Sequence, residues 1–340
     1  MSEINKDNFI DELGVKYSAD RKRLIKAPKD ITTYEIAEGT EVIYKCAFEY
    51  CENLTKIVIP ESVIEIECHA FWGCEKLTTI NIPKGITKIN DGTFGVCRSL
   101  TQIIIPEVVD EIGNGAFIAC NSLTNIHIPS GVTTIGHCAF DECTSLTKIN
   151  IPCGVTKINS NLFARCKNLT NITIPNGVTE IEEQAFWHCE NLISVNIPKG
   201  VTMIGEAAFS GCYNLANIDI PEGVTMIEAY TFIWCSSLTE IHIPKGVTMI
   251  GEAAFEGCSG LTNIDIPENV TEIGRSIFEE CSGLTTINIL GNVTKIGDYC
   301  FFRCDNLTSI TIPKGDNQLR QLIIDSDIKD KKLTEIIKHT

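Results

Sequence analysis

The chain has 340 residues and a formal net charge of −16 at pH 7, and the acidic excess lies in its long central part, because residues 1–30 and 316–340 hold acids and bases in nearly equal numbers. An acidic surface repels phosphate backbones and anionic lipid, which argues against nucleic acid and membrane surfaces as partners. No apolar run approaches the roughly 18 residues of a membrane-spanning helix, so membrane insertion is not expected.

Residues 1–30 are predicted to begin the fold rather than to direct the chain to a compartment. The opening "MSEINKDNFIDELG" is acidic and lacks the charged-then-apolar leader of a secretory signal. Residues 14–28, "GVKYSADRKRLIKAP", hold two short strand-like runs around a Ser-Ala-Asp turn. We expect a hairpin there that caps the edge of the following element.

Residues 31–315 repeat with a period of 23, and this repeat overrides the two-domain expectation that length alone would give. Cys follows each repeat Phe by three positions, and Leu follows each of those Cys by three more. The Phe column consists of Phe48, Phe71, Phe94, Phe117, Phe140, Phe163, Phe186, Phe209, Phe232, Phe255, Phe278 and Phe301. The pattern predicts one solenoid of twelve repeats and a final strand.

Each repeat is expected to supply two short strands and one helical turn. In "LTNIDIP", Leu261 and Ile264 face the core, as in the strand pattern of leucine-rich repeats. Asn263 and Asp265 alternate with them and face water, and Pro267 ends the strand. The segment V-T-x-I is predicted as a second strand, and A-F-x-x-C as a helical turn. The predicted fold class is therefore an α/β-type solenoid, mostly β, with short parallel strands whose stacked turns bury the Phe column.

The chain has 17 cysteines, an odd number that cannot pair completely within one chain. Equivalent cysteines in a stack point the same way, so we expect a ladder of buried free thiols, with oxidised cysteines as the alternative. The five cysteines outside this column share no other column and complete no metal site: Cys46, Cys68, Cys138, Cys153 and Cys300. Free thiols and the missing leader predict a reducing, cytoplasmic location.

Residues 316–340 break the period and are predicted to form a helical cap over the last repeat. Asp316 is a suitable helix N-cap. Leu333, Ile336 and Ile337 give one apolar stripe.

The unit "LTNIDIPENVTEIGRSIFEECSG", with its I-P break, V-T-x-I-G and A-F-x-x-C, resembles the BspA-like leucine-rich repeat family, as does the segment "GVKYSADRKRLIKAP". The resemblance covers about residues 14–315. It implies a curved solenoid, no catalysis and the binding of other proteins. Better-known members are surface proteins of mucosal bacteria and some protist parasites that attach to host matrix or plasma proteins. A cell-surface or secreted location is therefore the alternative to the cytoplasm.

The outward strand positions, dominated by Asn, Thr and Ser, are the first-choice binding surface, which the family fold makes the concave sheet. Asp219, His242 and Asp265 fall on successive strands about 4.8 Å apart, with Glu240 alongside. This group is either a site for a cation or basic side chain, or a solvated polar ladder. The candidate ligand-binding residues on this face are Asp219, Glu240, His242, Asp265, Asn217 and Asn263.

Met203, Met226 and Met249 occupy one column of three consecutive repeats, at a position that elsewhere holds mostly Lys and Glu. They form either an exposed apolar strip for self-association or a remnant of repeat duplication. Trp72, Trp187 and Trp234 follow the repeat Phe closely and either anchor a partner or cover the flank of the stack.

Enzyme motifs such as G-x-S-x-G, the P-loop and H-E-x-x-H are absent from the sequence. We therefore predict a non-enzymatic, monomeric scaffold that binds another protein through its polar sheet, without cofactor or metal. The alternative is a structural module that self-assembles side by side through the methionine strip.

Overall fold

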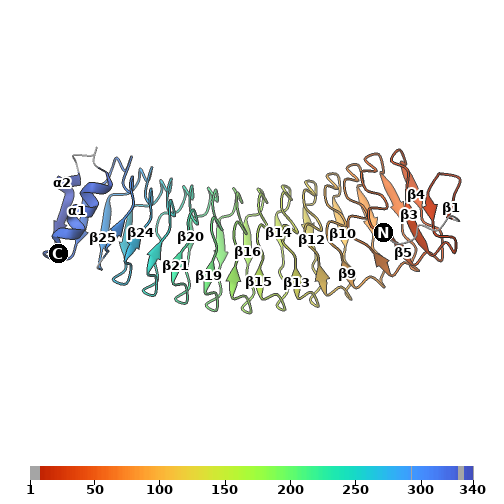
Figure 1. Cartoon of the computed structure of the whole chain (residues 1–340), viewed down its shortest axis with the longest axis horizontal. Helices are drawn as coiled ribbons and strands as arrows, with labels where there is room; N and C mark the ends of the chain where they lie inside the picture. The colour runs from red at the N-terminus through yellow and green to blue at the C-terminus, as the bar shows by residue number, and fades with distance from the viewer. Residues whose placement is uncertain (1–7, 292, 328–332, 340) are drawn as a thin grey trace. The chain divides into compact units, whose positions relative to one another are not determined.

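The structure is a computed structural model that describes residues 8–291, 293–327 and 333–339. The chain divides after Leu169 into two compact units, and each unit is a coil of similar turns (Figure 1). The parts of the predicted terminal segments that cover residues 1–7, 328–332 and 340 lie outside the described residues.

The unit that ends at Leu169 begins with two antiparallel strand pairs, β1 (Phe9–Ile10) with β2 (Lys16–Tyr17) and β2 with β3 (Arg23–Lys26). Parallel strands follow in two series. The L-T-x-I-x-I positions form β4 (Thr33–Glu35), β6 (Lys56–Val58), β8 (Thr79–Asn81), β10 (Gln102–Ile104), β12 (Asn125–Ile126) and β14 (Lys148–Ile149). The V-T-x-I positions form β5 (Val42–Ile43), β7 (Glu65–Ile66), β9 (Lys88–Ile89), β11 (Glu111–Ile112), β13 (Thr134–Ile135) and β15 (Lys157–Ile158).

The unit that begins at Thr170 repeats the same two series. The first comprises β16 (Asn171–Thr173), β18 (Ser194–Asn196), β20 (Asn217–Ile218), β23 (Asn263–Ile266), β25 (Thr286–Ile289) and β27 (Ser309–Ile312). The second comprises β17 (Glu180–Ile181), β19 (Met203–Ile204), β21 (Met226–Ile227), β22 (Met249–Ile250), β24 (Glu272–Ile273) and β26 (Lys295–Ile296). The predicted solenoid of short parallel strands is confirmed, and the repeat that contains His242 forms an isolated bridge in place of a strand of the first series.

Partners within each series lie 23 residues apart, as in the pairs Gln102↔Thr79 and Met226↔Met249. This register places every residue beside its equivalent in the next turn. The phenylalanines of the repeat column are consequently 0–3 % exposed. Neighbouring rings stack with centroids 5.2–5.9 Å apart between Phe48 and Phe163, and 5.2–6.3 Å apart between Phe186 and Phe301.

The segment around each Phe, predicted as a helical turn, is not a helix. The residues two before and two after each repeat Phe have φ between 50° and 73°, in the left-handed region. Their amides donate to the next turn of the coil and not along a helix, as Tyr50 N does to Trp72 O at 2.7 Å. Such a conformation costs about 1 kcal/mol or more per non-glycine residue, and the inter-turn hydrogen bonds offset this cost.

The first turn is closed by a buried pair of tyrosines. The hydroxyl groups of Tyr17 and Tyr34 lie 2.7 Å apart, and Tyr34 also donates to the carboxylate of Asp11 at 2.5 Å. The Tyr34 ring contacts Phe48 with centroids 6.1 Å apart, so it extends the aromatic column beyond its first Phe.

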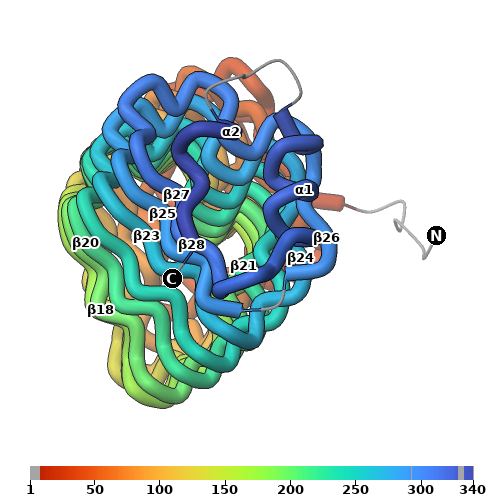
Figure 2. The backbone as a smooth tube through the Cα atoms, turned by 90° about the vertical axis from the view of Figure 1, so that its left-hand side faces the viewer, coloured from red at the N-terminus to blue at the C-terminus, as the bar shows by residue number. Residues whose placement is uncertain are grey.

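The last turn is closed by α1 (Asn317–Ser326), α2 (Leu333–Ile336) and β28 (Ile337–His339). Figure 2 shows α1 beside β26 and β28 beside β27. Asp316 caps α1 by accepting from Leu319 N at 2.8 Å. Where earlier phenylalanines donate to a carbonyl of the next repeat, Phe301 N donates to the Asp327 carboxylate at 2.8 Å. The cap thus supplies the acceptor that a further repeat would have provided.

The predicted cysteine ladder is buried, since every cysteine of the column from Cys51 to Cys304 is buried as a free thiol. The thiols of this column donate hydrogen bonds to the carbonyl of the Phe one turn earlier, wherever a thiol bond is described between Cys74 and Cys281. Cys74 Sγ, for example, donates to Phe48 O at 3.2 Å. Burial raises the thiol pKa to about 11 at Cys51 and about 12 at Cys258, from 9.0.

Replacing Phe255 with Ala should lower the free energy of unfolding by about 3–5 kcal/mol, because this ring is fully buried between Phe232 and Phe278. Phe302→Ala is the matched control, since Phe302 is 42 % exposed and its loss should cost about 0.5 kcal/mol or less. Urea unfolding followed by circular dichroism measures both. Equal losses would show that the column is not the core.

The buried thiols should make the protein sensitive to alkali. A thiol whose folded pKa lies above the unfolded value of 9.0 stabilises the fold fully below pH 9, and this contribution is lost as pH rises toward the folded pKa. At pH 10 each such thiol costs about 1.4 kcal/mol relative to pH 7.

Cys258→Ala should therefore reduce the loss of unfolding free energy between pH 8 and pH 10 by about 1.4 kcal/mol, whatever its effect at pH 7. Replacing the exposed Cys153 with Ala should leave this pH dependence unchanged. The interpretation is wrong if both variants follow the wild-type pH profile.

Candidate functional site

The outward side chains of the first strand series form a surface that we call the strand face. In the unit that ends at Leu169 it is composed of Lys56, Thr79, Gln102, Asn125 and Lys148, and of Val58, Asn81, Ile104, His127 and Asn150. All of these residues are exposed. Because their backbones pair in register, the face presents two columns of side chains at strand spacing.

The polar candidates predicted from the sequence lie on the strand face of the other unit. Asp219 pairs with His242 through an isolated parallel bridge, and Asp265 pairs with Asn288. The Asn288 amide donates to the Asp265 carboxylate at 2.8 Å, while His242 Nε2 lies 3.9 Å from the carboxylate of Glu222. Asn217, Glu240 and Asn263 are exposed beside them.

The polar group presents carboxylate, amide and imidazole side chains to solvent. Within residues 8–291, 293–327 and 333–339, no group of three His, Cys, Asp or Glu side chains is placed to hold a metal ion. Asp219 lies in an open groove of about 760 Å³ together with Asn196, Lys199 and Glu222. His127 in the first unit resembles His242 in lying close to a carboxylate, with Nε2 3.5 Å from Glu107.

The methionine strip lies on the second strand series. Met203 is 38 % exposed and Met226 is 37 % exposed, whereas Met249 is half-buried. Met226 and Met249 are direct partners on β21 and β22. The structure therefore brings two of the three side chains together as a strand pair and leaves two of the three well exposed.

A second groove, which the sequence analysis did not predict, lies on the strand face of the unit that ends at Leu169. It has a volume of about 760 Å³ and is walled by Val58, Ile104 and Val108. Ile104 is 82 % exposed, Val108 is 55 % exposed and Val58 is 38 % exposed. Between Val58 and Ile104, the Asn81 amide is engaged with the backbone of Ile59, donating to its carbonyl at 2.7 Å and accepting from its amide at 3.2 Å.

The groove has a charged rim of balanced sign, formed by Lys56, Lys84, Glu61 and Glu107. The signal for this site was present in the sequence. Val58 and Ile104 stand in a column that otherwise holds Asn, His, Thr, Asp and, in the first turn, Glu35. Val108 stands where most repeats have Gly. An exposed apolar residue in a column that is otherwise polar is a candidate for partner binding, on the same argument as the methionines.

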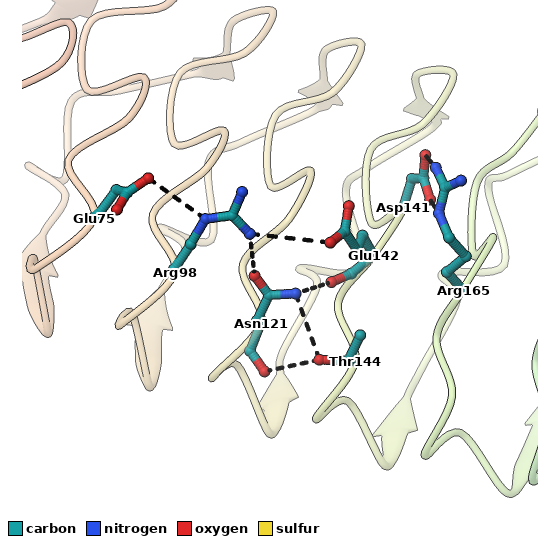
Figure 3. A network of polar contacts seen from close by, with 7 residues as sticks. All are labelled: Glu75, Arg98, Asn121, Asp141, Glu142, Thr144 and Arg165. Atoms are coloured by element: carbon teal, nitrogen blue, oxygen red, sulfur yellow. Dashed lines mark hydrogen bonds and ion pairs between the residues drawn. The ribbon is translucent and has the colours of Figure 1, made fainter.

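Residues within two positions of the column cysteines carry a network of polar contacts in the first unit (Figure 3). The Arg98 guanidinium donates to Asn121 Oδ1 at 2.9 Å and lies 3.5 Å from Glu75 and 3.9 Å from Glu142. The Asn121 amide in turn donates to Glu142 O at 2.9 Å. Positive and negative groups thus compensate one another on this side of the unit.

Asp141 and Arg165 form a bidentate salt bridge close by. Arg165 Nε donates to Asp141 Oδ1 at 3.1 Å, and Arg165 Nη2 donates to Asp141 Oδ2 at 2.7 Å (Figure 3). The Asp141 side chain is 5 % exposed. Burial raises the pKa of Asp141, and the hydrogen bonds from Arg165 oppose that shift. Arg165 therefore compensates the negative charge of the buried Asp141 carboxylate, which would be costly to bury without a partner.

The three tryptophans differ in exposure. Trp72 and Trp187 are half-buried, and Trp72 packs against His69 with ring centroids 5.2 Å apart. Trp234 is 41 % exposed. Covering the flank of the stack accounts for the first two, and Trp234 retains an accessible ring.

In the described residues, no helix is both long enough and apolar enough to cross a membrane.

Comparison with known proteins agrees with the geometry of the repeats. A leucine-rich repeat protein from Bacteroides ovatus is 29 % identical over 100 % of both chains, with a TM-score of 0.65. A leucine-rich cell surface protein from Faecalibacterium prausnitzii is 26 % identical over 95 % of this chain and 97 % of that chain, with a TM-score of 0.52. The pneumococcal vaccine antigen PcpA shares the fold at 18 % identity and a TM-score of 0.57, over 96 % of this chain and 89 % of that chain. No curated protein matches the chain.

Residues 26–147, 110–239 and 225–326 match the BspA-type leucine-rich repeat region in its six-copy form. These matches together span most of the chain, and they confirm the resemblance seen in the repeat unit. The chain belongs to the BspA-type leucine-rich repeat family.

Proposed function

We propose that the protein is a non-enzymatic scaffold that binds another protein through its strand face. The observation that carries this proposal is Ile104, an isoleucine that is 82 % exposed within a groove walled by other apolar side chains. Burying apolar surface contributes about 25 cal/mol per Å², so covering this side chain would favour association.

The groove favours an uncharged apolar side chain, aromatic or branched aliphatic, on an extended segment of the partner. Its rim charges balance, although the chain as a whole carries −16, so the groove offers no net charge to a charged occupant. Its volume of about 760 Å³ accommodates a few side chains. Gln102 and Thr79 stand exposed beside the apolar wall and are available for hydrogen bonds to the partner backbone.

The polar ladder from Asn217 to Asp265 extends the binding surface with hydrogen-bonding groups in the second unit. In this proposal Asp219, Glu240, His242 and Asp265 contribute specificity, because polar groups reject partners that leave them unpaired. An adhesin-like role is supported by the family and by the similarity to a cell surface protein of Faecalibacterium prausnitzii.

The location is a separate part of the proposal. A cytoplasmic location is supported by the ladder of free thiols, which persist in reducing compartments. A cell-surface location is the alternative, supported by the similar Faecalibacterium prausnitzii protein.

Selection from a displayed peptide library should yield peptides with an aromatic or branched aliphatic anchor, and Ile104→Asn should weaken their binding by roughly 10- to 100-fold. Asn is the residue that the same column carries at Asn81, so the variant should keep the fold. Biolayer interferometry with the selected peptides measures the loss.

Ile193→Thr is the matched control, because it also replaces an exposed isoleucine with the usual residue of its column. It should leave binding unchanged. Peptides that bind Ile104→Asn as tightly as wild type, or a library that yields no binder, would contradict the proposal.

Self-assembly through the methionine strip is the second candidate, favoured by the exposure of Met203 and Met226. If it operates, the average mass from sedimentation velocity should rise with concentration for wild type and remain monomeric for Met226→Lys. Lys is native to this column at Lys88, and Thr134→Lys provides the same charge change away from the strip. A wild-type monomer at every concentration would end this candidate.

A further inference from the structure

Among the described residues, no cation lies over one exposed aromatic ring that follows a column phenylalanine of the second unit, whereas cations lie over three other rings that follow or precede a column phenylalanine by one or two positions. Trp234, two residues after Phe232, is 41 % exposed. Its ring lies against the backbone of the next turn, since a Cβ added to Gly257 would meet Trp234 Cε3 at 2.5 Å. Glycine at 257 thus lets the indole lie close to the coil, with the remaining part of the ring accessible to solvent.

The same arrangement occurs in the first unit, where it includes a cation. Tyr50 stands at the equivalent position after Phe48, and Gly73 in the next turn makes room for its ring. The Lys29 ammonium lies over the Tyr50 ring, 5.5 Å from its centroid. Near the C-terminal cap, Arg275 and Arg303 lie over the rings of Tyr299 and Phe302 at 5.2 and 5.4 Å.

At Trp234 the position equivalent to Lys29 is occupied by Tyr213, which supplies no charge. Among the described residues, no cation lies over the Trp234 ring. Tryptophan is the aromatic side chain that attracts cations most strongly through its ring face. The site therefore offers a ring that binds cations well, and the described residues place no cation over it.

Three acidic residues, Glu252, Glu256 and Glu279, lie on the two turns that follow Trp234. Trp234 N donates to Glu256 O at 2.7 Å, so the two residues lie side by side on adjacent turns, and the ring lies over Gly257, the residue next to Glu256. Burial and the neighbouring carboxylates Glu279, Glu280 and Glu252 raise the pKa of Glu256. Glu280 has Arg303 as its partner, but in the described part of the chain Glu252, Glu256 and Glu279 have no ion-pair partner.

The contrast with the first unit shows that such a deficit is not general to this side of the repeats. There Arg98 compensates Glu75 and Glu142, and Arg165 compensates Asp141 (Figure 3). Around Trp234 the ring and the carboxylates are both complementary to a cation, and the described residues place none there.

We propose that Trp234, with Glu252, Glu256 and Glu279, binds an arginine side chain of a basic protein segment, the guanidinium stacking on the indole and pairing with the carboxylates. Arginine fits better than lysine because its planar group stacks on a ring while it donates several hydrogen bonds to carboxylates. Trp234 lies in the turn between the two strand series and does not belong to the strand face, so it provides a second and independent binding site.

The test measures fluorescence anisotropy of a labelled hexa-arginine peptide against the full chain, with hexa-citrulline as the neutral peptide of similar shape. Hexa-arginine should bind and hexa-citrulline should not. Trp234→Ala should weaken binding by roughly 3- to 10-fold, the usual range for losing a cation–ring contact. Ala119 occupies the same left-handed column with φ of 55°, so this variant should fold.

Two controls separate this site from general attraction of a polycation to an acidic protein. Tyr50→Ala removes the equivalent ring that already has Lys29 over it, and should not change binding. Glu256→Gln should weaken hexa-arginine binding, whereas Glu61→Gln, the same charge change on the strand face, should not.

The proposal is overturned if hexa-citrulline binds equally, if Trp234→Ala binds like wild type, or if Glu61→Gln loses as much affinity as Glu256→Gln. Ile104→Asn should leave hexa-arginine binding intact, so this result is independent of the strand-face proposal. Glu256→Gln keeps the test decisive should Trp234→Ala fail to fold.

Discussion

The fold depends on a single constraint, which is that every turn of the coil must have the same shape as the next. Stacked phenylalanines 5.2–5.9 Å apart fill the interior from Phe48 to Phe163, and the amides on either side of each Phe donate to the following turn. Both interactions require the same spacing and therefore reinforce each other. The left-handed residues beside each Phe are tolerated because they aim those amides at the neighbouring turn.

The sequence was sufficient for the period, the two strands and the buried columns, because apolar residues recur at fixed intervals. It was misleading for the segment around each Phe, where Ala, Phe and Cys at helical spacing suggested a helix. Left-handed φ at Val96 and Glu142 could not have been predicted, since neither residue type favours it. What decides the conformation is a hydrogen bond to a residue about 22 positions away, and a local pattern carries no information about that bond.

Some candidate sites could also be predicted from the sequence, and others could be found only in the structure. The polar ladder from Asp219 to Asp265 and the methionine column were visible in the sequence as departures from the repeat. Ile104 falls at an outward strand position in the sequence, but the groove around it could not be predicted, because its walls include Val108 from the following turn and its volume depends on the packing of both. Trp234 required the structure, because its significance lies in Gly257 beneath the ring and in the fact that no cation of the described residues lies over it.

Hydrogen exchange of the native protein tests the shared-turn geometry most directly. Amides such as those of Tyr50, Val96 and Trp234 lie in irregular turns, yet each donates at 2.7 Å to a carbonyl of the next repeat. They should exchange as slowly as the strand amides of the same repeat, and far more slowly than the exposed turns after each proline. If instead they exchange as fast as those turns, the turns do not hold one another and the account fails.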